Sequence, residues 1–225
     1  MAGSGQLASQ FSAAVPALIP AAPDGRCTVM SHPGVLSRHG FHPPDVLRGQ
    51  AELVFDADHL DRVVREGILK ARTSLDIATA DFKAMLVPTA SGRRAKSIID
   101  VFCHLAGKGV EIRLLHGGIP SRAVLQGLRR QLPGGVMIRR CPRLHAKAVI
   151  IDCGSMYLGS ANLTGAGLGA KGRGKRNFEI GVWTHASALI DAVLEHFNAL
   201  WEGRLCQSCR RHEVCPVPLE EPRLG

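Results

Sequence analysis

Long hydrophobic runs are missing from this sequence. No apolar stretch among its 225 residues reaches the roughly 18 needed to cross a membrane, so we expect no transmembrane segment. Residues 7–22 are apolar, but two prolines interrupt them and no Lys or Arg precedes them, which argues against a secretory signal. These absences predict a soluble, cytoplasmic protein.

Acidic residues are fewer than basic ones. Asp and Glu total 19 against 28 Lys and Arg, and the formal net charge is +9. Such a surface favours polyanions such as nucleic acid or acidic lipid head groups, although a soluble protein with no nucleic-acid role is the alternative. No carboxylate cluster that could hold a catalytic metal is evident. With 45% hydrophobic residues, the chain can bury the core of one sizeable domain with appendages or of two small domains.

The seven cysteines are an odd number, which argues against a disulfide framework in a reducing compartment. Cys206, Cys209 and Cys215 have C-x2-C-x5-C spacing, which is typical of the start of a zinc site and resembles the iron–sulfur motif of some nucleases and helicases. We therefore consider a structural zinc ion or iron–sulfur cluster there, against the alternative of three unligated thiols. Candidates for a further ligand are His212, Cys27, Cys103, Cys141 and Cys153.

Composition divides the chain into three parts. Residues 1–50 are rich in Gly, Ala, Ser and Pro, which predicts a flexible or loosely packed N-terminal arm. Residues 51–203 have the hydrophobic periodicity of a compact domain, and residues 204–225 form a cysteine-containing tail.

Strands and helices alternate within the compact domain. Strands are predicted at 52–55, 73–80, 110–116, 136–140, 148–151, 156–160 and 178–184. Helices are predicted from residue 58 to about 71, with Asp58 as the cap, around 98–105, and at 121–132 and 186–202. The alternation indicates an α/β fold with a mixed, mostly parallel sheet flanked by helices.

Residues 143–162, RLHAKAVIIDCGSMYLGSAN, contain the side chains with the clearest chemistry. His145 and Lys147 are two residues apart at the start of a predicted strand, so we expect them on the same face. Asp152 is an odd number of residues from both, which places it on the other face or in the turn, in a supporting role. For an isolated pair, burial among satisfied neighbours would be the alternative.

A phosphodiester suits these side chains. It repels anionic nucleophiles, so the neutral imidazole of His145 is a suitable nucleophile, and the Lys147 ammonium can stabilise the charge that develops. Ser160 and Asn162 share parity on the next strand and can donate hydrogen bonds to phosphate oxygens. These groups supply the electrostatics that a divalent metal would otherwise provide, so no catalytic cofactor is expected.

Six residues of this stretch follow one another at fixed spacing, namely His145, Lys147, Asp152, Gly159, Ser160 and Asn162. Their pattern, HxKx4Dx6GSxN, is that of the phospholipase D superfamily, which roughly residues 50–202 resemble. The resemblance implies a phospholipase D-like fold and a phosphodiesterase with a phosphohistidine intermediate. It makes Asp152 and Gly159 structural members of the motif. It also implies that Glu179 hydrogen-bonds and orients His145, against the alternative of a solvated Glu on a strand edge.

A second HxK motif is missing from the chain. In the family that it resembles, a histidine from a second motif protonates the leaving group. The resemblance therefore implies a homodimer about a two-fold axis, in which His145 is the nucleophile in one subunit and the general acid and base in the other. Single-motif members of that family include small bacterial endonucleases, a restriction enzyme and a mitochondrial enzyme discussed both as a nuclease and as a cardiolipin hydrolase.

Three functions remain open. The basic charge and the basic loop at 171–176 favour a metal-independent nuclease on DNA or RNA, with Arg143 adding to its phosphate groove. A phospholipase D or cardiolipin hydrolase on anionic lipid is the second, with the apolar residues 84–90 near its mouth. The third is a catalytically quiet nucleic-acid-binding subunit of a larger complex, because size and motif resemble the phospholipase-D-like component of DISARM-type phage-defence systems.

Overall fold

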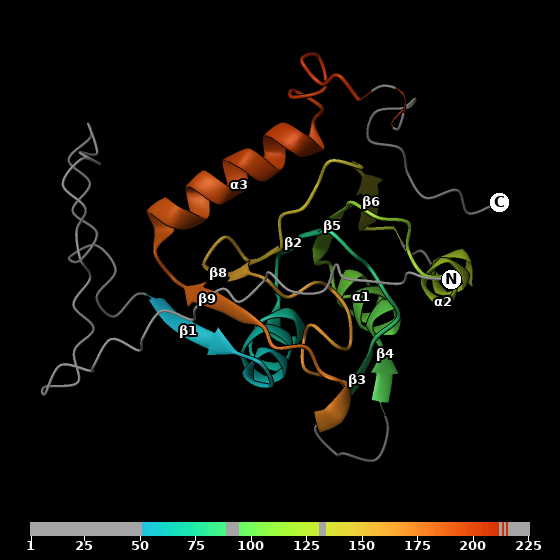
Figure 1. The fold of residues 1–225 in the computed structure, drawn as a ribbon, viewed down its shortest axis with the longest axis vertical. Helices are drawn as coiled ribbons and strands as arrows, with labels where there is room; N and C mark the ends of the chain where they lie inside the picture. The colour runs from blue at the N-terminus through green and yellow to red at the C-terminus, as the bar shows by residue number, and fades with distance from the viewer. Residues whose placement is uncertain (1–50, 89–94, 131–133, 212, 214, 216–225) are drawn as a thin grey trace, which may run out of the picture. The chain divides into compact units, whose positions relative to one another are not determined.

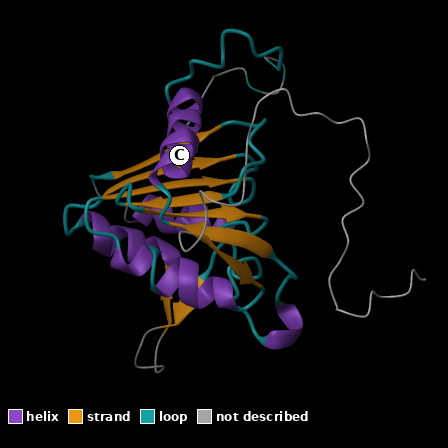
Figure 2. Ribbon diagram, turned by 90° about the vertical axis from the view of Figure 1, so that its left-hand side faces the viewer, coloured by secondary structure: helices purple, strands orange, loops and turns teal. Residues whose placement is uncertain are grey.

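The computed structural model describes residues 51–88, 95–130, 134–211, 213 and 215, which form a mixed sheet with helices on both sides (Figures 1 and 2). Its seven strands are β1 (Ala51–Phe55), β2 (Ser74–Thr79), β5 (Glu111–His116), β6 (Val136–Arg140), β7 (Ala148–Ile151), β8 (Ser155–Gly159) and β9 (Ile180–Thr184). Their spatial order is β1-β9-β8-β7-β2-β5-β6. A separate hairpin pairs β3 (Leu86–Pro88) with β4 (Ala95–Ser97). The predicted arm at 1–50 lies outside the described residues.

Strand β2 joins two differently built halves of the sheet. It is parallel to β5, which is parallel to β6, whereas β7, β8, β9 and β1 continue from its other edge in antiparallel pairings. Helices α1 (Ile98–Ala106) and α2 (Arg122–Arg130) provide the crossovers that parallel neighbours need. The predicted mixed α/β sheet flanked by helices is confirmed. Parallel pairings are nevertheless two of the six between these strands, and the tight turn between β7 and β8 accounts for one of the four antiparallel pairings.

The helix predicted from residue 58 forms as two short pieces. Leu60–Arg65 is a π-helix and Ile68–Lys70 a 3-10 helix, and His59 rather than Asp58 occupies the N-cap position. The apolar face still packs as its spacing predicts, since Val63, Val64 and Ile68 are buried.

The sheet separates two apolar layers. On one face, residues of α1, α2 and the two short helices pack against alternate residues of the strands, including Leu75, Ile77 and Leu114. On the other face, α3 (Ser187–Trp201) covers β2, β5 and β7, with Phe197 and Trp201 buried against Ala78, Leu115 and Ala148. The alternation of inward residues along each strand produces this division.

Beneath α3 the sheet contains a buried ion pair. Arg113 Nε donates to Asp76 Oδ1 at 2.6 Å, and Arg113 Nη1 donates to Asn198 Oδ1 of α3 at 2.9 Å. The same guanidinium lies 5.0 Å from the ring centroid of Phe197, while Arg139 lies 4.7 Å from that of Trp201. These contacts fix α3 on the sheet.

Within the described residues, no helix is both long enough and apolar enough to cross a membrane.

Candidate active site

His145 and Lys147 lie in the extended segment that leads into β7, just before its first residue. Lys147 Nζ is 3.1 Å from Nδ1 and 3.3 Å from Nε2 of His145, and it donates to the His145 carbonyl oxygen at 2.7 Å. The two side chains therefore meet on one side of the segment, as their spacing predicts. An ammonium group can only donate and a neutral imidazole has one acceptor nitrogen, so at most one of the two ring contacts is a hydrogen bond.

Burial affects the two residues differently. His145 is exposed, whereas Lys147 is 9% exposed. Loss of solvation lowers the pKa of Lys147, and the nearby carboxylate of Glu179 raises it in opposition. The site therefore presents an accessible imidazole above a largely desolvated cation, where electrostatic attraction to a phosphate is stronger than in water.

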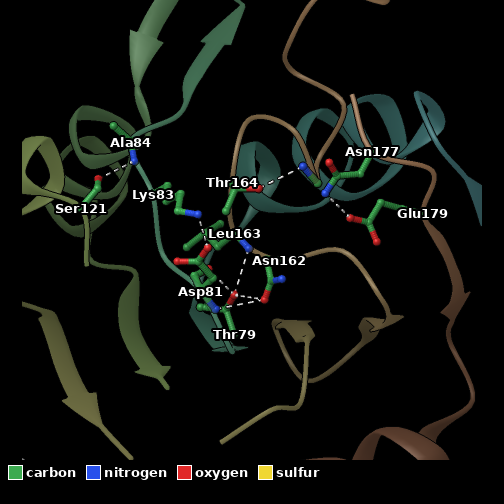
Figure 3. Close-up of polar contacts among 11 residues, drawn as sticks. Thr79, Asp81, Lys83, Ala84, Ser121, Asn162, Leu163, Thr164, Asn177 and Glu179 are labelled. Atoms are coloured by element: carbon green, nitrogen blue, oxygen red, sulfur yellow. Dashed lines mark hydrogen bonds and ion pairs between the residues drawn. The ribbon is translucent and has the colours of Figure 1, made fainter. Parts of the chain in front are cut away.

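Glu179 is buried and immediately precedes β9. Its carboxylate accepts a short hydrogen bond from Ser160 Oγ and one of 2.9 Å from Asn177 Nδ2, the second of which Figure 3 shows. Ser160 Oγ also accepts from the Ile180 backbone N–H at 3.1 Å. In the described part of the chain, no hydrogen bond joins Glu179 to His145. The geometry thus links Glu179 to Ser160 directly and to Lys147 through charge, which differs from the expected orientation of His145.

Asn162 lies against the end of β2 (Figure 3). Its Oδ1 accepts from the Asp81 backbone N–H at 3.0 Å and from Thr79 Oγ1 at 3.4 Å. Thr79 Oγ1 also accepts from the Leu163 backbone N–H at 2.9 Å. Because a backbone N–H can only donate, the oxygen of the amide must face Asp81 and the NH2 group is left for another acceptor. This is the orientation that a phosphate oxygen requires.

A second layer of residues supports the site, and the sequence analysis missed it. Tyr157 Oη accepts from the Ala161 backbone N–H at 3.0 Å and lies 3.0 Å from His59 Nε2. Both side chains are fully buried, and burial raises the pKa of Tyr157 to about 12. Asp56, after β1, accepts from the Glu179 backbone N–H at 2.8 Å through its side chain. The sequence contains one indication of this layer, because His59 lies beside the apolar face of the helix predicted from residue 58.

Gly159 belongs to the motif because its place has no room for a side chain. A Cβ there would lie 2.4 Å from Tyr157 Oη, 2.6 Å from Gly181 Cα and 2.7 Å from the Ile180 carbonyl oxygen. Strands β8 and β9 thus approach closely where Ser160 begins the site.

Asp152 lies at the other end of β7 from His145 and Lys147. In a left-handed conformation with φ of 52°, it accepts from the backbone N–H groups of Arg72, Thr73 and Ser74 at 3.0, 2.8 and 3.0 Å, and from Thr73 Oγ1 at 3.0 Å. Its contacts join the β7–β8 turn to the start of β2.

The cysteine tail returns to the sheet beside the catalytic segment. Cys206 and Cys209, in and after the turns that follow α3, line a cavity of about 250 Å³ together with Cys141, Arg143 and His145. Arg143 donates to Cys209 Sγ at 3.4 Å, so the predicted phosphate-groove residue contacts the tail.

The remaining candidate metal ligands lie in other elements or outside the described residues. Cys103 lies in α1 and Cys153 in the β7–β8 turn, while Cys27 and His212 lie outside the described residues. Among the described side chains, no group of three or more His, Cys, Asp or Glu is arranged to hold a metal ion.

Exposed basic and apolar side chains occur in the loop before Glu179 and in strand β3. Lys171, Arg173 and Lys175 are exposed in the loop before Asn177, which includes a short 3-10 helix at Arg173–Lys175. Phe178, next to Glu179, is 96% exposed. In the predicted apolar segment 84–90, Leu86 is exposed, and residues 89 and 90 lie outside the described residues.

Comparison with known proteins supports the fold. A family model described as "Cardiolipin synthase, PLD-like domain" matches residues 64–201. Nuc from Salmonella typhimurium, a phospholipase D family member, is 19% identical with a TM-score of 0.51, over 68% of this chain and 93% of Nuc. NucT from Helicobacter pylori is 16% identical with a TM-score of 0.51, over 68% of this chain and 96% of NucT.

A larger protein has the same fold in part of its chain. Phosphatidylserine synthase from Haemophilus influenzae is 16% identical with a TM-score of 0.51, over 67% of this chain and 36% of the synthase. A search of curated proteins gave no match. At these identities the structural likeness concerns the fold, and it confirms the architecture expected from the motif.

Proposed function

Since the chain belongs to the family of phospholipase D-like domains and is an enzyme of the phosphodiesterase type, we propose that it is a metal-independent nuclease. The observation that carries this proposal is the contact of the Lys147 ammonium with both ring nitrogens of His145. It places an exposed imidazole nucleophile directly beside a buried cation that can bind phosphate.

The proposed reaction has two steps. An imidazole nitrogen of His145 attacks phosphorus, the P–N bond forms, and the P–O bond to the leaving alcohol breaks as that oxygen takes a proton from the protonated His145 of a second subunit. Water then attacks phosphorus and gives its proton to the second imidazole. The P–N bond breaks and releases a phosphate monoester.

The neighbouring residues have distinct roles in these steps. Lys147 and the amide nitrogen of Asn162 bind the non-bridging oxygens and stabilise the charge of each transition state. Glu179 holds the Ser160 hydroxyl and, by its charge, favours the cationic form of Lys147. Asp152 acts through the fold and does not touch the substrate.

Nucleic acid is the proposed substrate because of the exposed cations beside the site. The loop between Asn162 and Glu179 contains Lys171, Arg173 and Lys175. Within this loop, the Arg176 side chain donates to the Lys171 carbonyl oxygen at 2.5 Å. Repeated phosphates of a polynucleotide can contact this loop and the Lys147 site together. The cytoplasmic location and the membership of a phage-defence complex remain predictions from the sequence.

A second subunit would complete the site. Leu53, Phe55, Leu158 and Ile180 form an apolar strip on one face of β1, β9 and β8, and they are between 42 and 61% exposed. Exposed apolar surface of this kind is typical of an interface. We propose that a second copy covers the strip and brings its own His145 to the scissile phosphate.

Hydrolysis of anionic phospholipid is the second candidate function. It is favoured by Phe178, an almost fully exposed aromatic side chain beside Glu179, and by the exposed Leu86. Both could enter the apolar part of a lipid surface.

Activity measurements separate these functions. Wild type, His145→Ala and the control His104→Ala, an exposed histidine on α1, are incubated with labelled single- and double-stranded DNA, RNA and cardiolipin vesicles without added divalent metal. We expect wild type and the control to cleave nucleic acid and His145→Ala to be inactive. Lipid turnover without nucleic-acid cleavage would overturn the nuclease proposal, and full activity of His145→Ala would overturn the catalytic role.

Binding measurements test the basic loop. Replacing Lys171, Arg173 and Lys175 by Gln should weaken DNA binding. The slope of the logarithm of the binding constant against the logarithm of the salt concentration should become less steep by roughly 0.9 for each phosphate that the variant no longer neutralises. Lys108→Gln, at an exposed position after α1, is a control that removes one positive charge outside this loop. An unchanged salt dependence in the triple variant would contradict binding through this loop.

Sedimentation tests the second subunit. Wild type should be a dimer, and Phe55→Glu with Ile180→Glu should give a folded, inactive monomer, because two charges would be buried in the interface. A monomeric wild type with full nuclease activity would refute the dimer.

A further inference from the structure

A cavity of about 250 Å³ lies beside His145. Two of its wall residues, His145 and Ala146, belong to the extended segment that leads into β7, whereas His196 and Leu200 come from α3. Leu205, in the turn that follows α3, lies in the same wall. Segments that are distant in the chain therefore enclose a space that begins at the proposed nucleophile.

The cavity is within reach of a group bonded to the reacting phosphorus. In the proposed reaction, phosphorus lies against the ring of His145 while Lys147 and Asn162 bind its non-bridging oxygens. A polynucleotide joins each base to phosphorus through a single sugar, so a base next to the reacting phosphate lies close to His145. Because His145 also forms part of the cavity wall, that base can enter the cavity while phosphorus stays at the imidazole.

The cavity wall combines apolar surface with hydrogen-bonding groups. Leu144, Leu200 and Leu205 contribute aliphatic side chains, whereas Arg143 contributes N–H donors and His196 its ring nitrogens. Ligand sites of this kind hold an apolar body and orient it through a few polar groups. A nucleobase has the matching composition, since its two faces stack on apolar or guanidinium surfaces and its edge forms hydrogen bonds.

Arg143 is held at the cavity by the tail. Its Nη1 donates to Cys209 Sγ at 3.4 Å, and both residues line the cavity. A guanidinium has five N–H donors and a planar face, so it can bind the acceptor edge of a base or stack on its ring. An acyl chain in the same place would remove Arg143 and His196 from water without giving them an acceptor, which costs free energy. The chemistry of the wall therefore favours a base over a lipid chain.

Resting on the nuclease function proposed above, we propose that this cavity binds the base of a nucleotide next to the scissile phosphate. Arg143 and His196 contact the edge of the base, and Leu200 and Leu205 pack against its faces. A base within a duplex is covered by its partner and its stacked neighbours, so it enters only after it is unpaired. The substrate that this site selects is therefore a nucleic acid whose base next to the cleaved bond is unpaired.

Three DNA substrates of equal length test the base site. They are a single strand, its duplex, and a single strand in which abasic sugar–phosphate units replace the central nucleotides. Cleavage is mapped to the central bonds. Wild type should cleave the base-bearing single strand with a kcat/KM roughly tenfold or more above that for the other two, because contacts to one stacked base are typically worth such a factor.

Two substitutions in the cavity wall separate base contacts from phosphate contacts. Arg143→Ala and His196→Ala should each lower kcat/KM several-fold more for the base-bearing strand than for the abasic strand, whereas a residue that bound only phosphate would lower both equally. Arg210→Ala, at an exposed tail position outside the cavity wall, removes the same charge as Arg143→Ala and should keep the wild-type ratio between the strands. If Arg143→Ala fails to fold by circular dichroism, His196→Ala decides, because its side chain is exposed on α3.

The outcomes distinguish the base site from the nuclease function. Equal kcat/KM for the base-bearing and abasic strands overturns the base site and leaves the nuclease function standing. If no strand is cleaved, the nuclease function fails, and binding of the two fluorescently labelled strands then decides the base site. Tighter binding of the base-bearing strand that Arg143→Ala abolishes supports it, and equal binding overturns it.

A lipid occupant would give a different result. A second cavity of about 200 Å³ beneath α3 shares Leu144, Ala146, His196 and Leu200 with the first, so an acyl chain could use both. Turnover of cardiolipin vesicles that is slowed by Leu205→Trp, without cleavage of any DNA strand, would assign the cavity to an acyl chain and overturn the base site.

Discussion

Replacing Asp152 should reduce stability and leave the catalytic groups in place. Its carboxylate accepts hydrogen bonds from the backbone of Arg72, Thr73 and Ser74 and from the Thr73 hydroxyl, and Oδ1 accepts all four. Asp152→Asn can keep an oxygen at that position but loses the charge. Asp152→Ala removes every acceptor and places Ala in a left-handed conformation.

The two substitutions should differ in magnitude. Hydrogen bonds to charged groups contribute about 1.5–3 kcal/mol when buried, but Asp152 is half-buried, so about 0.5–1 kcal/mol for each of the four bonds is appropriate. The left-handed backbone adds about 1 kcal/mol for Ala, whereas Asn tolerates it. We expect a loss in the free energy of unfolding of about 3–5 kcal/mol for Asp152→Ala and about 1–2 kcal/mol for Asp152→Asn.

The pH dependence gives a second check. Burial raises the pKa of Asp152, but hydrogen bonds from Thr73, Ser74 and Arg72 outweigh it and hold the pKa below its usual value. A lowered folded-state pKa means that the carboxylate stabilises the fold above the unfolded pKa of about 3.9 and loses this effect as pH falls. The gap between wild type and Asp152→Asn should therefore be full at pH 7, begin to narrow below about pH 4, and close only as pH falls through the lowered folded-state pKa.

Urea unfolding at pH 7 and pH 3.5, together with kcat and KM at pH 7, measures these effects. A folded Asp152→Asn with wild-type stability and abolished kcat would refute the reasoning, because it would assign Asp152 a direct role in the chemistry.

Three further substitutions test the packing around the site. Arg113→Ala should cost about 3–5 kcal/mol in urea unfolding, because it leaves the buried Asp76 carboxylate without its ion pair; a cost below about 1 kcal/mol would contradict this. Tyr157→Phe leaves His59 Nε2 and the Ala161 N–H unpaired, so it should cost about 1–3 kcal/mol and reduce kcat, whereas an unchanged melting temperature would count against the buried network. Gly159→Ala should cost about 1–3 kcal/mol in thermal unfolding, and tolerance of the methyl group would mean that β8 and β9 separate easily.

The hydrophobic pattern of a segment predicted those strands that depend mainly on the residues within the segment. The strands at 136–140 and 148–151 form at the predicted residues, because runs of β-branched and apolar residues favour buried strands. The meeting of His145 with Lys147 followed from the two-residue period. The proportion of parallel strand pairs could not be predicted from the local sequence, because it depends on which strands are neighbours in the folded sheet.

Partners that are distant in sequence could not be inferred from spacing. Glu179 is where the motif resemblance places an acid, yet its carboxylate bonds to Ser160 and Asn177, because the close approach of β8 and β9 decides which group it reaches. The same limit applies to Asp56 and to the return of the tail toward Cys141.

The pairing of β1 with β9 has a consequence for synthesis on the ribosome. Figure 1 shows the two strands side by side, although about 125 residues separate them in the chain. During translation, Asp56 emerges early but has no Glu179 backbone to hold until β9 has left the exit tunnel. The site is therefore complete only after β9 has been synthesised, and a nascent chain that stops before residue 179 lacks the backbone group that Asp56 holds.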